Sequence, residues 1–203
     1  MGKFIVNLLF KLGSRLLAKI QLYRYHVRMR DLVARGLVLG KNVTIQYSVE
    51  IDDEYPYLIR IGNNCSISNQ VRLLAHDATL FKFTDGHTRL GKIEIRDNCF
   101  IGERAIILPG VTMGPNVLVA AGSVVNKDIL PNSCVMGVPA RFYARFDDLI
   151  ERHKQQIEER NVVQFSDLKM DDQIGKKIWR AVQDGDVYVK GYVGRYPYTL
   201  NSE

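Results

Sequence analysis

Apolar and polar positions repeat with a period of six residues through the middle of the chain. Between Ile95 and Leu130 six hexads follow one another without a gap, each opening on an apolar residue and placing a mostly small residue fifth. The first positions are Ile95, Ile101, Ile107, Met113, Val119 and Val125. A period of six fits neither an α-helix nor a hairpin sheet, and it is typical of a parallel β-helix with one flat side per hexad.

The same period continues upstream in two shorter runs. These runs open on Leu39, Ile45 and Ile51, and on Ile61, Ile67 and Leu73. Residues 52–60 and 77–92 interrupt the rhythm, and we expect both to leave the coil as surface loops. With three hexads in each turn, the pattern predicts about four coils whose first-position side chains fill the interior.

The ends of such a coil need covers, because their backbone groups lack a neighbouring coil. Pro131 ends the repeat, and a charged helix is predicted from about Phe146 to Arg160 as the cover of the last coil. The sequence therefore divides into an N-terminal helical segment (1–36), a β-helix domain (37–142) and a C-terminal helix with an extension (143–203). For residues 161–203, which contain Trp179 and a strand-like run at 187–193, we expect a packed extension or an oligomer arm and infer no function.

The first 36 residues combine basic and apolar side chains. They hold eight basic residues and one acid, a charge of +7 compared with +6 for the whole chain, so nothing indicates a nucleic-acid surface on the main body. Lys11, Arg15 and Lys19 interrupt the apolar run, which argues against a signal peptide and against a spanning helix. Two interpretations stay open: a helix packed on the β-helix or on a neighbouring subunit, or an interfacial helix on an anionic membrane.

The three cysteines, Cys65, Cys99 and Cys134, are too few and too scattered for a disulfide framework or a metal site. We expect reduced, buried thiols and a cytoplasmic location. The N-terminal helix leaves open a second possibility, peripheral contact with the inner face of the membrane.

The second half of the repeat resembles a known family. The stretch IGERAIILPGVTMGPNVLVAAGSVVNKDILPNSCVMGVPAR, residues 101–141, closely follows the pattern of the hexapeptide-repeat acyltransferases, in the branch of the maltose, galactoside and xenobiotic acetyltransferases. The resemblance covers about residues 39–146. It implies a mainly β fold, a left-handed parallel β-helix, a homotrimer with active sites between subunits, acetyl-CoA as donor and no metal.

The resemblance also implies a catalytic residue. His76, at the end of a hexad run, stands where the family places its histidine. Free imidazole titrates near neutral pH, which suits a base that takes a proton from an attacking hydroxyl or amine. His87, in the second interruption, is a candidate for contact with the acceptor.

Further site residues are carried over from the family pattern position by position. The donor would meet Ala121 along its pantetheine arm, Asn126 and Lys127 beyond it, and Arg141 near the adenosine phosphates. Glu103 departs from the family, which commonly has a small or neutral residue beside the thioester. Acceptor candidates are Asp52, Asp53 and Asn69, because acids and amides bind sugar hydroxyls.

These features together predict an acetyl-CoA-dependent O-acetyltransferase acting on a sugar hydroxyl, in surface polysaccharide biosynthesis. N-acetylation of an amino sugar or of a nucleotide-linked amino sugar is the alternative that the residues leave open. A non-catalytic scaffold and a γ-carbonic anhydrase share the fold, but the anhydrase needs three zinc-binding histidines and the coil region has only His76 and His87.

Overall fold

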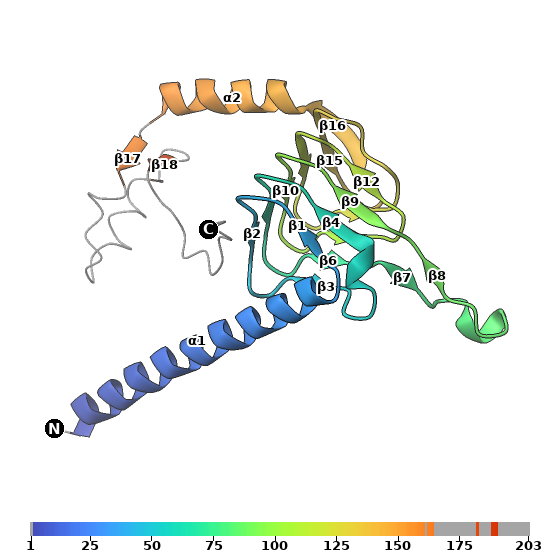
Figure 1. The fold of residues 1–203 in the computed structure, drawn as a ribbon. Helices are drawn as coiled ribbons and strands as arrows, with labels where there is room; N and C mark the ends of the chain where they lie inside the picture. Colours follow the sequence, from blue (N-terminus) through green and yellow to red (C-terminus); the bar gives the residue numbers. More distant parts are fainter. Residues whose placement is uncertain (1, 161, 165–181, 183–187, 191–203) are drawn as a thin grey trace.

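A parallel β-helix forms the body of the protein, and one helix leaves each end of it (Figure 1). The computed structural model describes residues 2–160, 162–164, 182 and 188–190. The predicted class is confirmed: the chain is mainly β and winds as a left-handed parallel β-helix of hexads.

Three sheets make the three flat sides of the coil. The first contains β1 (Val38–Leu39), β4 (Ile59–Ile61), β9 (Ile93–Ile95) and β12 (Thr112–Met113). The second contains β2 (Thr44–Ile45), β5 (Ser66–Ile67), β10 (Phe100–Ile101), β13 (Val117–Val119), β15 (Ser133–Met136) and β16 (Arg141–Arg145). The third contains β3 (Glu50–Ile51), β6 (Arg72–Leu73), β11 (Ile106–Ile107) and β14 (Val124–Val125). Only β15 and β16 pair antiparallel within these sheets.

The register stacks the first positions of the hexads on one another. Ile101 lies opposite Ile67 on one side and Val119 on the other, and all three side chains are buried. The first and third sheets each have four strands, one from each coil, so the four coils predicted from the period are confirmed. Their aliphatic interior is the main source of stability, since burying each such side chain contributes roughly 1.5–3 kcal/mol.

Both interruptions of the period leave the coil as loops, as predicted. The first follows β3 and contains the short 3₁₀ helix η1 (Pro56–Leu58). The second is a longer hairpin of β7 (His76–Asp77) and β8 (Arg89–Leu90), with η2 (Phe81–Phe83) at its tip, and it projects from the body (Figure 1).

A ladder of asparagines lines one corner of every coil. Each adopts a left-handed backbone, with φ between 54° and 58°, and its side-chain amide bonds the next asparagine at 2.7–3.2 Å. The ladder consists of Asn42, Asn64, Asn98, Asn116 and Asn132. Asparagine suits this corner because it tolerates positive φ and also offers a donor and an acceptor to its neighbours.

Substitutions at the centre of the ladder should separate these two contributions. Asn98→Gly keeps the backbone conformation but loses both amide contacts, and should cost about 1–2 kcal/mol of unfolding free energy. Asn98→Ala adds strain at positive φ and should cost about 1 kcal/mol more. Urea unfolding of both variants measures the difference, and equal losses would show that the backbone conformation contributes nothing.

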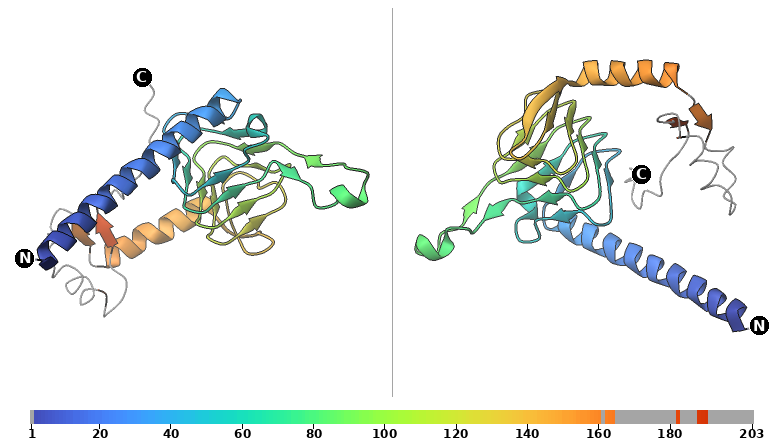
Figure 2. Two further views of the ribbon diagram at one scale, coloured as in Figure 1. Left: turned by 90° about the horizontal axis from the view of Figure 1, so that it is seen from below. Right: turned by 180° about the vertical axis from the view of Figure 1, so that it is seen from behind.

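The last turns of helix α1 (Gly2–Ala34) pack on the first coil. Met29 and Leu32 are buried there, and the Tyr25 hydroxyl donates a hydrogen bond to the Ile45 carbonyl at 2.8 Å. The rest of α1 runs away from the body (Figure 2). Within the described part of the chain, no helix is both long enough and apolar enough to cross a membrane.

The last coil is followed by helix α2 (Phe146–Glu159), close to the predicted range. Beyond it, β17 (Val162–Gln164) pairs in parallel with β18 (Tyr188–Lys190), which falls inside the strand-like run seen in the sequence. Trp179 and most of the C-terminal extension lie outside the described residues. The three cysteines are buried free thiols, as expected.

Candidate active site

His76 and Asp52 form a close pair where two loops leave the coil. Asp52 directly follows β3. Strand β6 lies next to β3 in the third sheet, and His76 begins β7 shortly after β6 ends. The His76 Nδ1 atom lies 2.6 Å from Asp52 Oδ2. The pairing of Ile51 with Leu73 brings the two loops together, so the β-helix itself fixes the contact.

The Asp52 carboxylate accepts hydrogen bonds on both oxygens. Its Oδ1 accepts from the backbone N–H groups of Glu54 at 3.1 Å and Tyr55 at 3.2 Å. Its Oδ2 accepts from the Ala75 N–H at 2.9 Å and faces the His76 ring. With a side chain only 1% exposed, Asp52 is surrounded by donors and is held in a single orientation.

This environment keeps the carboxylate ionised. Burial works to raise the pKa of Asp52, but the hydrogen bonds from His76, Ala75 and Tyr55 together outweigh it and lower the pKa below its usual 3.8. An ionised carboxylate can only accept hydrogen bonds, so the proton of a neutral imidazole must sit on Nδ1. The His76 Nε2 atom is then left with a free lone pair, which is what a general base requires.

The ring of His76 is reachable from outside. Its side chain is 31% exposed, and the Tyr55 ring packs beside it with ring centroids 5.3 Å apart. Tyr55 belongs to the same loop as Asp52, so one short segment both orients the imidazole and flanks it.

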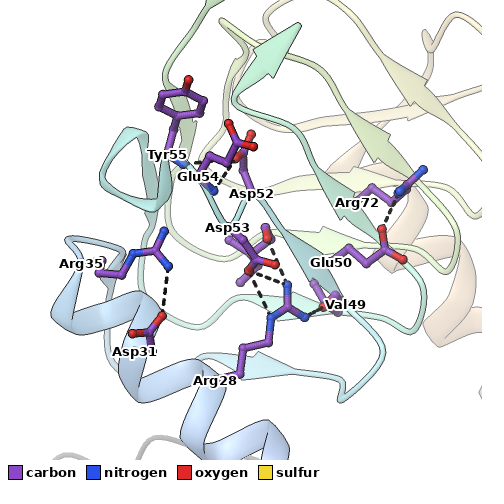
Figure 3. A network of polar contacts seen from close by, with 11 residues as sticks. Arg28, Asp31, Arg35, Val49, Glu50, Asp52, Asp53, Glu54, Tyr55 and Arg72 are labelled. Carbon is purple, nitrogen blue, oxygen red and sulfur yellow. Dashed lines mark hydrogen bonds and ion pairs between the residues drawn. The ribbon is translucent and has the colours of Figure 1, made fainter. Parts of the chain in front are cut away.

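Helix α1 is tied to this loop by Arg28 (Figure 3). The guanidinium contacts Asp53 Oδ1 at 3.0 Å through Nη2 and at 3.3 Å through Nε. It also donates to the carbonyl oxygens of Ile51 at 3.1 Å and Val49 at 3.3 Å. The network therefore fixes the strand end from which Asp52 emerges.

Replacing Arg28 by alanine should destabilise the fold by about 1–2 kcal/mol. The half-exposed ion pair itself contributes at most about 1 kcal/mol, and the bonds to two carbonyls supply the remainder. Arg35→Ala is the matched control, since Arg35 lies one residue beyond the end of α1 and its guanidinium pairs with Asp31 of that same helix, at 3.1 Å. Urea unfolding should show the larger loss for Arg28→Ala, and equal losses would contradict a role for Arg28 beyond a surface pair.

The acceptor residues expected from the sequence are not placed alike. Asp52 contacts His76 and its side chain is buried, while Asp53 is more exposed and is engaged by Arg28. Asn69 accepts a hydrogen bond from the Ser48 hydroxyl at 2.9 Å, on another corner of the coil. His87 lies exposed in the hairpin loop, with its Nδ1 atom against the Thr84 carbonyl.

Three of the predicted positions form a column on one corner, between the second and third sheets. The Arg104 N–H donates to the Asn69 carbonyl at 3.0 Å, and the Gly122 N–H donates to the Glu103 carbonyl at 2.8 Å. These bonds stack Asn69, Glu103 and Ala121 on successive coils. A Cβ on Gly102 would meet the Ala121 nitrogen at 2.5 Å, so this corner requires close packing of backbone on backbone.

The other predicted donor residues share a hollow at the far end of the coil. Asn126, Lys127 and Arg141 line a cavity of about 600 Å³, together with Arg145. Three basic side chains around one cavity make it suited to an anion such as a phosphate group. Arg145 was missed by the sequence analysis, and its spacing of four from Arg141 on β16 was the available signal.

Among the described residues, no group of three or more His, Cys, Asp or Glu side chains is arranged to hold a metal ion.

Comparison with known proteins identifies relatives of the β-helix. Residues 92–127 match the family described as bacterial transferase hexapeptide (six repeats). YvoF of Bacillus subtilis (strain 168), a protein assigned as an acetyltransferase, is 32% identical over 137 residues, which is 68% of this chain and 72% of YvoF. Galactoside O-acetyltransferase of Escherichia coli (strain K12) is 35% identical over 112 residues, 54% of each chain, so this chain spans about half of that relative.

Among solved structures, a galactoside acetyltransferase in complex with coenzyme A is 27% identical. The similarity covers 68% of this chain and 84% of that one, with a TM-score of 0.48.

Proposed function

The chain belongs to the bacterial hexapeptide-repeat acyltransferases, and from this premise we propose that it moves an acetyl group from acetyl-CoA to a sugar hydroxyl. The observation that carries the proposal is the His76–Asp52 contact of 2.6 Å, which leaves Nε2 of the imidazole free to accept a proton. The relatives named for galactoside acetylation support a sugar as the acceptor.

The geometry supports a direct transfer. His76 Nε2 takes the proton of the acceptor hydroxyl as its oxygen attacks the thioester carbonyl, forming the new C–O bond. Asp52, bonded to Nδ1–H, stabilises the imidazolium that results. When the tetrahedral adduct collapses, the C–S bond breaks and the CoA sulfur leaves with the proton held on Nε2, which restores neutral His76.

The donor would be held by groups on two corners of the coil. Lys127, Arg141 and Arg145 offer charge to the phosphates of CoA, while Ala121 and its column offer a narrow backbone surface to the pantetheine arm. Because the column and the cavity occupy different corners, an active site between neighbouring copies of a homotrimer accounts for both sets. We include that assembly, and a cytoplasmic location where acetyl-CoA is available, in the proposal.

Removing a basic side chain from the cavity should weaken donor binding. Lys127→Ala and Arg141→Ala should each raise KM for acetyl-CoA about 5- to 20-fold, with a smaller effect on kcat, because the lost interaction is made before and during the reaction alike. Lys41→Ala, at an exposed position on the first coil, is the control. Steady-state kinetics at varied acetyl-CoA give the result, and an unchanged KM in both cavity variants would remove the donor assignment.

The function itself is tested by release of free CoA thiol from acetyl-CoA, measured over a panel of sugars and amino sugars. Thiol release that depends on a neutral sugar, with an O-acetyl product identified by mass spectrometry, is the expected result. Product formed only on amino sugars would establish N-acetylation, and the panel therefore includes both free and nucleotide-linked amino sugars. Failure to bind CoA would favour a non-catalytic scaffold.

A precursor of a surface polysaccharide is the acceptor class we favour.

A further inference from the structure

Helix α1 carries an apolar stripe whose side chains are exposed in the described structure. Leu16, Ile20, Tyr23 and Val27 recur at intervals of four, three and four residues, the spacing of one helix face. Their exposed fractions are 60%, 45%, 69% and 49%. In the sequence, the same spacing continues back through Leu12, Leu9 and Ile5.

This stripe faces away from the β-helix. Each residue of an α-helix turns the direction of its side chain by about 100°, so positions two apart differ by about 200°. Tyr23 and Val27 each precede a buried contact residue, Tyr25 and Met29, by two positions. The stripe is therefore on the side of α1 opposite the face that packs on the first coil, and toward its N-terminus the helix leaves the body (Figure 2).

The charge around the stripe is of one sign. From Gly2 to Arg30 the helix has no acidic residue, and the first acid, Asp31, is paired with Arg35. Helical spacing places the exposed Lys19 and Arg24 along the two edges of the stripe. The basic residues of this segment are Lys3, Lys11, Arg15, Lys19, Arg24, Arg28 and Arg30.

That charge distinguishes between the two surfaces that could cover the stripe. Helices that pair with copies of themselves place opposite charges at the edges of their apolar seam, and like charges there are destabilising. Copies of α1 would bring only basic edges together. An anionic lipid surface instead attracts each basic side chain while its acyl region accepts the apolar face.

We propose that α1 lies on an anionic membrane surface, with the stripe of Leu16, Ile20, Tyr23 and Val27 in the interface and the basic edges at the headgroups. Because Met29 and Leu32 pack on the first coil and Arg28 bonds the loop of Asp52, the bound helix would hold the β-helix beside the membrane. The proposal is independent of the reaction that the protein catalyses.

The full-length protein should sediment with vesicles of phosphatidylcholine and phosphatidylglycerol, and much less with vesicles of phosphatidylcholine alone. Raising the salt to about 0.5 M should release most of it, because screening then acts over a few Å. Ile20→Glu and Gln21→Glu form a matched pair, since they add the same charge at neighbouring exposed positions on different faces.

The pair separates insertion of the stripe from simple attraction. Gln21→Glu changes only the net charge and should lower the partition coefficient about fivefold. Ile20→Glu also removes an inserted apolar side chain, and should lower the partition coefficient at least about tenfold further. Circular dichroism checks that both variants keep the helix.

Equal losses in the two variants would overturn the proposal, and so would a wild-type protein that stays in the supernatant with anionic vesicles. If the stripe is instead buried between copies of the chain, Ile20→Glu alone would lower the mass in solution measured by light scattering, with no vesicle binding by the wild type. That result would show that a second copy of the chain, and not a membrane, covers the stripe.

Discussion

Replacing His76 by alanine should lower kcat/KM for acetyl transfer by about 10²- to 10⁴-fold. The acceptor hydroxyl would then have no positioned base as it attacks the thioester. The fold should be little affected, because Asp52 keeps its bonds from the N–H groups of Glu54, Tyr55 and Ala75.

The loss is measured by thiol release at saturating acetyl-CoA, with thermal unfolding and light scattering as checks on fold and assembly. His153→Ala is the matched control, since His153 is exposed on α2 and the Nδ1 atom of its ring lies 3.1 Å from the Leu149 carbonyl of the same helix. Turnover by His76→Ala close to that of His153→Ala would show that the imidazole is not the base.

Replacing Asp52 by asparagine should cost nearly as much activity, about 10²- to 10⁴-fold in kcat. The asparagine amide cannot accept all the hydrogen bonds that the carboxylate accepts, because one of its two terminal atoms is a donor. If the amide nitrogen faces His76, the proton moves from Nδ1 to Nε2 and the base is lost. If it faces Glu54 and Tyr55, the part-buried N–H groups of these residues lose this acceptor, at a cost of at most about 1–3 kcal/mol.

Asp53→Asn is the comparison for Asp52→Asn, because it makes the same chemical change one residue along, in a side chain that is 64% exposed. Asp53→Asn should lower kcat by no more than a few-fold, and it should lower the free energy of unfolding less than Asp52→Asn does. Equal effects of the two changes would mean that the Asp52 contact to His76 does not orient the base.

The lowered pKa of Asp52 also predicts how stability depends on pH. A carboxyl group whose pKa is lower in the folded protein stabilises it above the unfolded value, near 3.8, and that contribution is lost as the pH falls through the folded value. Wild type should therefore lose its stability advantage over Asp52→Asn in acid below about pH 4. Thermal unfolding across that range would show the two curves converging.

The hexads made the coil predictable, because each flat side of a β-helix corresponds to one six-residue repeat of the sequence. First-position residues such as Ile101 and Val119 were expected to be buried and stacked, and they are. The places where the two loops leave the coil were also visible as interruptions of the period. Both features depend on positions six residues apart, which a single sequence displays.

The contact between Asp52 and His76 depends on pairing between coils, whereas residue type alone predicts that Asp52 binds the acceptor. The signal was present, since pairing Ile51 with Leu73 places Asp52 next to the segment that carries His76. The asparagine ladder was missed for the same reason, because insertions of different lengths separate Asn42, Asn64 and Asn98 in the sequence. The division at residues 36 and 142 and the extension beyond residue 160 remain predictions.

The double variant His76→Ala/Asp52→Asn shows whether Asp52 acts through His76. If Asp52 serves only to fix the tautomer and charge of His76, removing it has nothing further to change once the imidazole is gone. We expect kcat/KM of the double variant to equal that of His76→Ala within about twofold. If the double variant instead loses the product of the two single losses, the two residues act independently and Asp52 does not act through His76.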